Sequence, residues 1–252
     1  MKEIVPSFLG FAPIAPQRAF EDIASQVREL VARGKLKPGD RLPAERELAA
    51  KLNVSRNTLR EALRALELSG MIELRKGATG GAFVVPGNSD VVVNGLRDLY
   101  HLGAITPKDL TEARIWLEGM VVRIACERLH ADELDALDAN VHAAAAAYKA
   151  GDFAESARLH QRFHTLLGDA TRNPVVAILM EGVMEVMGGF VESIGVADNT
   201  FTVPSRRRLL KLLRERNADA AAAEMVRFLE RLHAVYMERW NNRRPANDSQ
   251  GV

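Results

Sequence analysis

Residues 43–77 constrain the fold of this chain more than any other stretch. A helical pattern at residues 44–52 is followed by the break "NVS" and by a second helical pattern at residues 56–69, which Ser55 can cap. Gly70 ends that helix, and "MIELR" and "AFVV" are typical of two short strands around the turn "KGATGG". Together with a helix expected at residues 17–34, this order of elements predicts a winged helix-turn-helix.

The first turn of the helix at residues 56–69 carries side chains suited to DNA. In a helix-turn-helix the second helix enters the major groove, and its first turn faces the base edges. This turn offers Ser55, Arg56, Asn57 and Thr58, with Arg60 one turn later. Arginine can pair bidentately with guanine, while short hydroxyl and amide side chains reach phosphates or bases. A solvated charged helix beside an ordinary hairpin is the alternative interpretation.

The expected wing and the charge distribution also favour DNA as the partner of the first part of the chain. Arg75, Lys76 and Gly77 fall at the tip of the hairpin, from which a cation can reach the minor groove or the DNA backbone. Residues 1–86 carry 14 Lys and Arg against 10 Asp and Glu, whereas the remainder carries 20 against 23. This asymmetry weakly supports a polyanionic partner for the first part of the chain.

Beyond the stretch "PGNSD" at residues 86–90, the sequence predicts only helices, separated by caps and glycines. The predicted fold is therefore mainly α, with an N-terminal winged helix-turn-helix and a C-terminal all-α helical bundle. The expected boundaries are an N-terminal arm at 1–16, a DNA-binding domain at 17–85, a linker at 86–90, a helical domain at 91–240 and a disordered tail at 241–252.

Composition places the chain in the cytoplasm. A single cysteine, Cys126, cannot form an internal disulfide, which fits a reducing compartment, and we expect it to be a small buried residue. No apolar run is expected to reach the length of a membrane span, and "IVPSFLGFAPIAP" is too broken by proline for a signal peptide. We therefore expect no membrane association.

The stretch "LKPGDRLPAERELAAKLNVSRNTLREALRALELSGMIELRKGATGGAFV" closely resembles the DNA-binding domain of the GntR family of bacterial transcriptional regulators. The match runs from about residue 17 to residue 85. Arg46, Arg56 and Arg60 match the arginines that carry most DNA contacts in that family. The DNA-binding residues that the resemblance implies are Arg46, Ser55, Arg56, Asn57, Thr58, Arg60, Lys76 and Gly77.

The helical part looks like the FCD domain, the effector-binding domain of the FadR-type subgroup. Arg114 and Glu118 in "LTEARIWLEG" match its "R…LE" element. Phe163, His164 and Asn173 in "ARLHQRFHTLLGDATRNP" match a second element. The resemblance implies that residues 91–240 bind an effector and support dimerisation.

The chain departs from this subgroup at its metal site. Many FCD domains hold a divalent metal with one carboxylate and three histidines. Here His160 stands at the carboxylate position and His164 at the first histidine, while Arg206 and Phe228 stand at the other two. Residues 160 and 164 share one helical face, so the two histidines could still bind zinc, nickel or manganese. His233 is expected to lie off the inward face.

A buried arginine at a ligand position would repel a metal and attract a carboxylate through a bidentate pair. We therefore expect a metal-free pocket for a small carboxylate metabolite, with Arg114 and Arg206 as anion anchors and His160 and His164 as polar lining. A residual metal site at His160 and His164 and a core polar network remain as alternatives.

The expected function is a ligand-responsive transcriptional regulator, and the resemblance favours a repressor over an activator. It would bind a palindromic double-stranded DNA operator as a homodimer, because two half-sites give a helix-turn-helix its specificity. A metal-dependent helical hydrolase using His160 and His164 is the enzymatic alternative, although Gln161 stands where an H-E-x-x-H motif has its glutamate. A non-specific architectural DNA binder is the other alternative, but it would not need a ligand-sized second domain.

Overall fold

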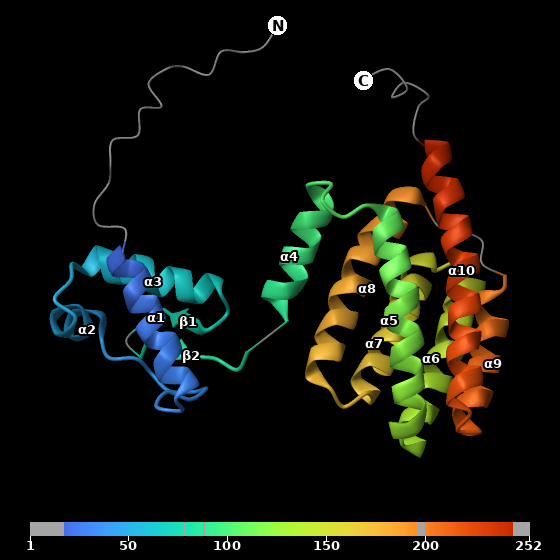
Figure 1. Cartoon of the computed structure of the whole chain (residues 1–252), viewed down its shortest axis with the longest axis horizontal. Helices are drawn as coiled ribbons and strands as arrows, with labels where there is room; N and C mark the ends of the chain where they lie inside the picture. The colour runs from blue at the N-terminus through green and yellow to red at the C-terminus, as the bar shows by residue number, and fades with distance from the viewer. Residues whose placement is uncertain (1–17, 78, 88, 196–199, 244–252) are drawn as a thin grey trace, which may run out of the picture. The chain divides into compact units, whose positions relative to one another are not determined.

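The computed structural model describes residues 18–77, 79–87, 89–195 and 200–243 (Figure 1). Within these ranges the chain forms ten helices and one two-stranded sheet. It divides into two compact units between Val91 and Val92, and each unit is considered by itself. The mainly α fold class is confirmed, with a winged helix-turn-helix first and an all-α bundle second.

The first unit contains the elements expected from the sequence. Helices α1 (Arg18–Ala32), α2 (Glu45–Lys51) and α3 (Arg56–Leu68) precede the strands β1 (Ile72–Arg75) and β2 (Gly81–Val84). Ser55 caps α3, because its hydroxyl accepts a hydrogen bond from the Thr58 backbone N–H at 3.1 Å. Leu59, Leu63 and Leu66 on the inner face of α3 are buried and form the core of the unit with side chains from α1 and β1.

The wing contains a third extended segment that the sequence analysis did not predict. Arg41 forms a β-bridge with Phe83, and the Leu42 backbone N–H donates to the Ala82 carbonyl at 2.8 Å. Glycine is required at residue 80, since an added Cβ would lie 2.3 Å from the backbone carbonyl oxygen of Arg75. The bridge of Arg41 and the hydrogen bond of Leu42 anchor the hairpin to the segment that precedes α2.

The second unit consists of helices whose starts follow the capping rules. Thr106 and Asp109 form a capping box on either side of Pro107, at the start of its helix. Asp152 and Asn173 each accept a hydrogen bond from a backbone N–H of the helix that they precede. The helices are α4 (Asp90–His101), α5 (Pro107–Arg128), α6 (Ala131–Lys149), α7 (Phe153–Ala170), α8 (Pro174–Ile194), α9 (Thr202–Arg214) and α10 (Ala218–Arg243).

Helix α5 runs between α8 and α10 in the view of Figure 1. It packs against α7, α8 and α10, while α9 packs against α6 and α10. Phe163, Met180 and Phe190 are fully buried in the shared core, and so is Cys126, as expected. This arrangement brings one face of α5 into contact with three other helices.

Two expectations need adjustment. Helix α8 does have the length and composition of a membrane span, with 21 residues and a mean hydropathy of 1.7, although its side chains from Met180 to Phe190 contribute to the core. Helix α10 continues to Arg243, so residues 241–243 are helical and not part of a tail. The arm at 1–16 and the tail from residue 244 lie outside the described residues.

The core of the first unit can be tested on two leucines of α3. Leu66 is 0% exposed and Leu68 is 83% exposed. Leu66→Ala should lower the free energy of unfolding of this unit by about 2–5 kcal/mol, because it removes buried methyl groups and leaves a cavity. Leu68→Ala should change it by less than about 0.5 kcal/mol. Urea unfolding followed by circular dichroism measures both, and equal effects would contradict the packing.

Candidate functional site

Most of the expected DNA-contacting residues are exposed in the first unit. Arg46, Arg56, Asn57 and Arg60 are exposed on α2 and α3, and Lys76 and Gly77 are exposed on the wing. The side chains of Ser55 and Thr58 are engaged within the unit, because their hydroxyls hydrogen-bond to each other at 2.8 Å. Both hydroxyls therefore help to fix the start of α3 in the DNA-free protein.

Glu45, at the first position of α2, is a component that the sequence analysis did not identify. Its Oε2 accepts a hydrogen bond from Arg60 Nε at 2.8 Å and lies 3.8 Å from a terminal nitrogen of Arg56. All three side chains are partly exposed, so these ion pairs add little to stability. They do orient two of the expected DNA-contacting arginines relative to α2.

Arg41, which precedes α2, contacts two residues of the wing. Its guanidinium donates to the Gly80 carbonyl and lies 5.8 Å from the centre of the Phe83 ring, on which Arg75 also stacks at 4.4 Å. A groove of about 430 Å³ lies between the start of α2, α3 and the wing. Arg41, Arg75 and Lys76 line it together with Glu45 and Glu67, so the groove carries a net charge of about +1.

In the second unit, four charged or polar side chains meet in the core. Arg114 and Glu118 come from the inner face of α5, and Arg114 Nε donates to Glu118 Oε1 at 2.7 Å. His164 from α7 lies between them and Arg206 of α9: a terminal nitrogen of Arg114 lies 2.8 Å from its Nε2, and one of Arg206 lies 2.5 Å away. All four residues are almost completely buried.

The hydrogen bonds assign the protonation state of His164. Two guanidinium groups donate to its Nε2, so that nitrogen carries no proton, and its Nδ1–H donates to the other oxygen of Glu118. Burial lowers the pKa of His164 to about 3, an effect that the charge of Glu118 offsets only in part. Burial alone would raise the pKa of Glu118, but His164 and Arg114 lower it to about 2.

Arg206 has fewer partners than a buried guanidinium requires. It lies between the rings of Phe163 and Phe228, 4.1 and 4.8 Å from their centres, and its Nε has no hydrogen-bond partner among the described residues. Burial lowers its pKa to about 9; Glu118 opposes this shift and Arg114 adds to it. With His164 neutral, two guanidinium groups face one carboxylate, which leaves a buried net charge of about +1.

His160 lies one turn before His164 and is half-buried. Burial lowers its pKa to about 4, and the charges of Arg206 and Arg114 contribute. A metal bound to His164 would have to displace Glu118 or both guanidinium groups. In the ranges that the structure covers, no group of three or more His, Cys, Asp and Glu side chains is placed to hold a metal ion.

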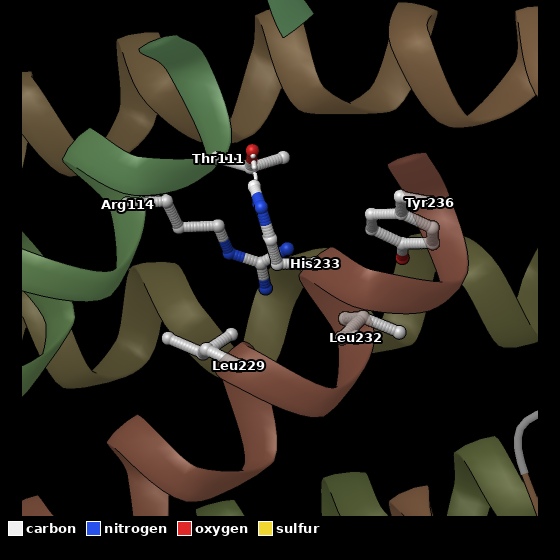
Figure 2. Close-up of a pocket in the computed structure, with 6 residues that line it drawn as sticks. All are labelled: Thr111, Arg114, Leu229, Leu232, His233 and Tyr236. Atoms are coloured by element: carbon white, nitrogen blue, oxygen red, sulfur yellow. Dashed lines mark hydrogen bonds between the residues drawn. The ribbon is translucent and has the colours of Figure 1, made fainter. Parts of the chain in front are cut away.

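Figure 2 shows the outer side of Arg114, where a cavity of about 10 Å³ lies between α5 and α10. Thr111, Tyr236 and two leucines line it with Arg114 and His233. His233, which we expected off the inward face, lies against α5 instead, with its Nδ1 2.7 Å from the Thr111 hydroxyl. A cavity of this size has room for about one water molecule. Glu118, His164 and Arg206 do not line this cavity, and their burial closes the charged network to solvent in this structure.

The buried histidine makes stability depend on pH. The pKa of His164 is about 3 in the folded chain and near 6.5 when unfolded, so the unfolded state binds more protons between these values. Stability should therefore fall as pH drops below about 6.5. The loss from His164 should be about 2 kcal/mol between pH 7 and pH 5. His160, whose pKa is also lowered, should add to the loss in this range, and Glu118 should add to it only below about pH 4.5.

Urea unfolding at a series of pH values measures this dependence. His164→Gln should show a shallower loss of stability with acid than the wild type, because it cannot take up the proton. His142→Gln should keep the wild-type dependence, since His142 is exposed. Equal slopes for wild type and His164→Gln would mean that His164 is not held neutral by its surroundings.

Comparison with known proteins identifies both units. Residues 19–84 match the model of bacterial regulatory proteins of the gntR family, and residues 109–231 match the FCD domain. The transcriptional repressor NanR of Cronobacter sakazakii is 26% identical over 241 residues, which cover 90% of this chain and 89% of the relative. A putative L-lactate dehydrogenase operon regulatory protein of Escherichia coli is 31% identical over 183 residues, covering 71% of this chain and 69% of the relative.

A solved structure agrees at the level of the fold. Streptococcus agalactiae GntR superposes with a TM-score of 0.64 at 24% identity, covering 86% of this chain and 99% of that chain. The matching families and these relatives are transcriptional regulators, so the hydrolase hypothesis is set aside. The chain is not an enzyme: it belongs to the GntR family of bacterial transcriptional regulators, and its helical half is an FCD domain.

Proposed function

We propose that this regulator is a repressor that binds a palindromic operator as a dimer and is released by a small organic acid. Its place of action would be the cytoplasm, where the operator lies. The observation that carries the effector part is the buried net positive charge around Arg206. The repressor assignment draws on the name of NanR, which is described as a transcriptional repressor.

The exposed surface of the first unit supports operator reading. Arg56 and Arg60 project from the start of α3, where a recognition helix meets base edges. Arg46 on α2 and the positively charged residues beside the wing would contact the DNA backbone between the major and minor grooves of the duplex. When DNA binds, Glu45 would either lose its contacts with Arg56 and Arg60 or keep these arginines oriented toward the bases.

Arg56→Ala should weaken specific operator binding by about 1–3 kcal/mol and relax selection at one base pair, because a bidentate contact to guanine is lost. Arg33→Ala removes the same charge from the same unit, at the exposed end of α1. It should leave operator affinity nearly unchanged. Fluorescence anisotropy with operator and scrambled duplexes measures both variants.

Either of two results would contradict this part of the proposal. Unchanged operator affinity in Arg56→Ala would remove that residue from base reading. Weak discrimination by the wild type between operator and scrambled DNA, together with a steep salt dependence, would favour an architectural DNA binder.

An anion would complete the buried site in the helical unit. A carboxylate could accept hydrogen bonds from Arg206, including its unpartnered Nε, and would neutralise the excess charge. Two guanidinium groups disfavour a metal there, so the arrangement supports the anion site over the zinc, nickel or manganese alternative. The name of the Escherichia coli relative mentions L-lactate dehydrogenase, an enzyme of a small carboxylic acid.

The closed state of the site is relevant to control. Arg206 and His164 are almost completely buried, so an organic acid could reach them only if helices that pack together in the free protein separate. A ligand shifts an equilibrium only if it binds two states differently. Separation of α5 from its neighbours by the ligand would supply that difference and change the geometry of the DNA-binding units.

Arg206→Met should abolish the response to the effector and retain operator binding, because methionine keeps much of the volume but not the charge. Arg207→Met is the matched control, since Arg207 is exposed on the same turn of α9. Thermal-shift screening of small carboxylic acids, beginning with L-lactate, would find a stabilising ligand, and release of operator DNA would then be measured for each variant.

The effector proposal has a clear failing result. A full response to the same acid in Arg206→Met would exclude Arg206 as the anchor. About one zinc, nickel or manganese per chain, in protein purified without chelator, would instead restore the metal site as the better explanation.

A further inference from the structure

Helix α5 has an exposed stripe on the face opposite Arg114 and Glu118. Its members are separated by three or four residues and therefore share one side of the helix. At its centre Trp116 is 72% exposed and Met120 is 45% exposed, although tryptophan is usually largely buried in a folded chain. We call this set the α5 stripe: Lys108, Glu112, Trp116, Met120, Arg123 and Glu127.

The charged side chains of the α5 stripe are complementary to those of a second copy of the same stripe. If two copies of α5 lie antiparallel with a two-fold axis near residue 118, Glu112 of one copy lies opposite the partner's Arg123, and Lys108 lies opposite the partner's Glu127. Trp116 then lies opposite the partner's Met120. Each contact occurs twice, as a two-fold interface requires. The apolar side chains occupy the middle and the charged ones the two ends.

We propose that the α5 stripe is the surface through which two copies of this chain pair. This inference rests on the proposed function, which requires a dimer but does not say which face forms it. Four of the five steps along the stripe are four residues and one is three, so its members follow a ridge of the kind along which two helices pack. An unrelated protein partner would not need a charge pattern with two-fold symmetry, whereas a second copy does.

The charged members of the stripe already have partners within the chain, but these contacts are weak. Lys108 Nζ lies 3.8 Å from Glu112, and Arg123 pairs with Asp219 of α10. These side chains are partly or largely exposed, so each pair contributes little and can be shared with a second copy. The paired arrangement would place Glu112 between its own Lys108 and the partner's Arg123.

The position of the stripe links the interface to the buried site. Arg114 and Glu118 project from the opposite side of the same helix. A ligand that moves α5 to reach Arg114 would therefore also move the surface between the two copies. In this way an effector could alter the geometry of the dimer without touching the interface.

The test uses the full chain in analytical ultracentrifugation over a dilution series without DNA. The wild type should be dimeric at the upper concentrations. Glu112→Arg and Arg123→Glu each place like charges opposite each other twice, and each should weaken the dimer by at least about tenfold. The double variant with both changes should restore most of the wild-type affinity, which a merely structural role would not produce.

Glu230→Arg is the matched control, because Glu230 is exposed on α10 outside the stripe. It should leave the dimer unchanged. Thermal unfolding of every variant checks that the chain still folds. A wild-type dimer that all the single variants leave intact would overturn the α5 stripe as the interface and would not affect the proposed function. A wild type that stays monomeric even on operator DNA would overturn the proposed dimer itself.

Fluorescence gives a second readout. Trp240 is the other tryptophan, so Trp240→Phe leaves Trp116 as the only one. Emission from this variant should shift to shorter wavelength as concentration rises, because pairing buries Trp116. A monomer in which Trp116 is already shielded would show that another part of the same chain covers the stripe, and would overturn the proposal.

Discussion

The helical half of the protein is organised around two guanidinium groups that are buried with one carboxylate. Removing a charge from water is costly unless it is paired and hydrogen-bonded. Glu118 satisfies Arg114, and a neutral His164 accepts from both arginines, but Arg206 keeps an unpartnered nitrogen between two aromatic rings. Four helices of the unit meet this network or the residues around it. This imbalance is the observation on which the proposed anion site rests.

Helix α5 connects this imbalance to the rest of the unit. One face carries the charged network, and its outer face carries an exposed tryptophan between complementary charges. The same helix packs against α7, α8 and α10. A small shift of α5 would therefore change the buried site, the core packing and the outer surface together. This is the kind of element through which a small ligand can act at a distance.

Many elements of the fold could be predicted, because local signals mark them. Ser55 caps the helix that it was expected to cap, and Gly70 follows α3. The bridge of Arg41 to Phe83 was missed, since two residues 42 positions apart leave no periodic signal. Glu118 was recognised only as a match to a motif. An Arg and a Glu four residues apart on an otherwise apolar helical face could have indicated a buried ion pair.

The sequence by itself determined the order of the elements, the winged helix-turn-helix and the family, because these follow from caps, periodicity and a long specific motif. Only the tertiary structure decided which partners the arginines have, that His164 is neutral, and that His233 faces Thr111. Those properties depend on side chains from four helices meeting in a dry interior. Charge, burial and hydrogen bonding there are set by neighbours distant in sequence, and no local pattern encodes them.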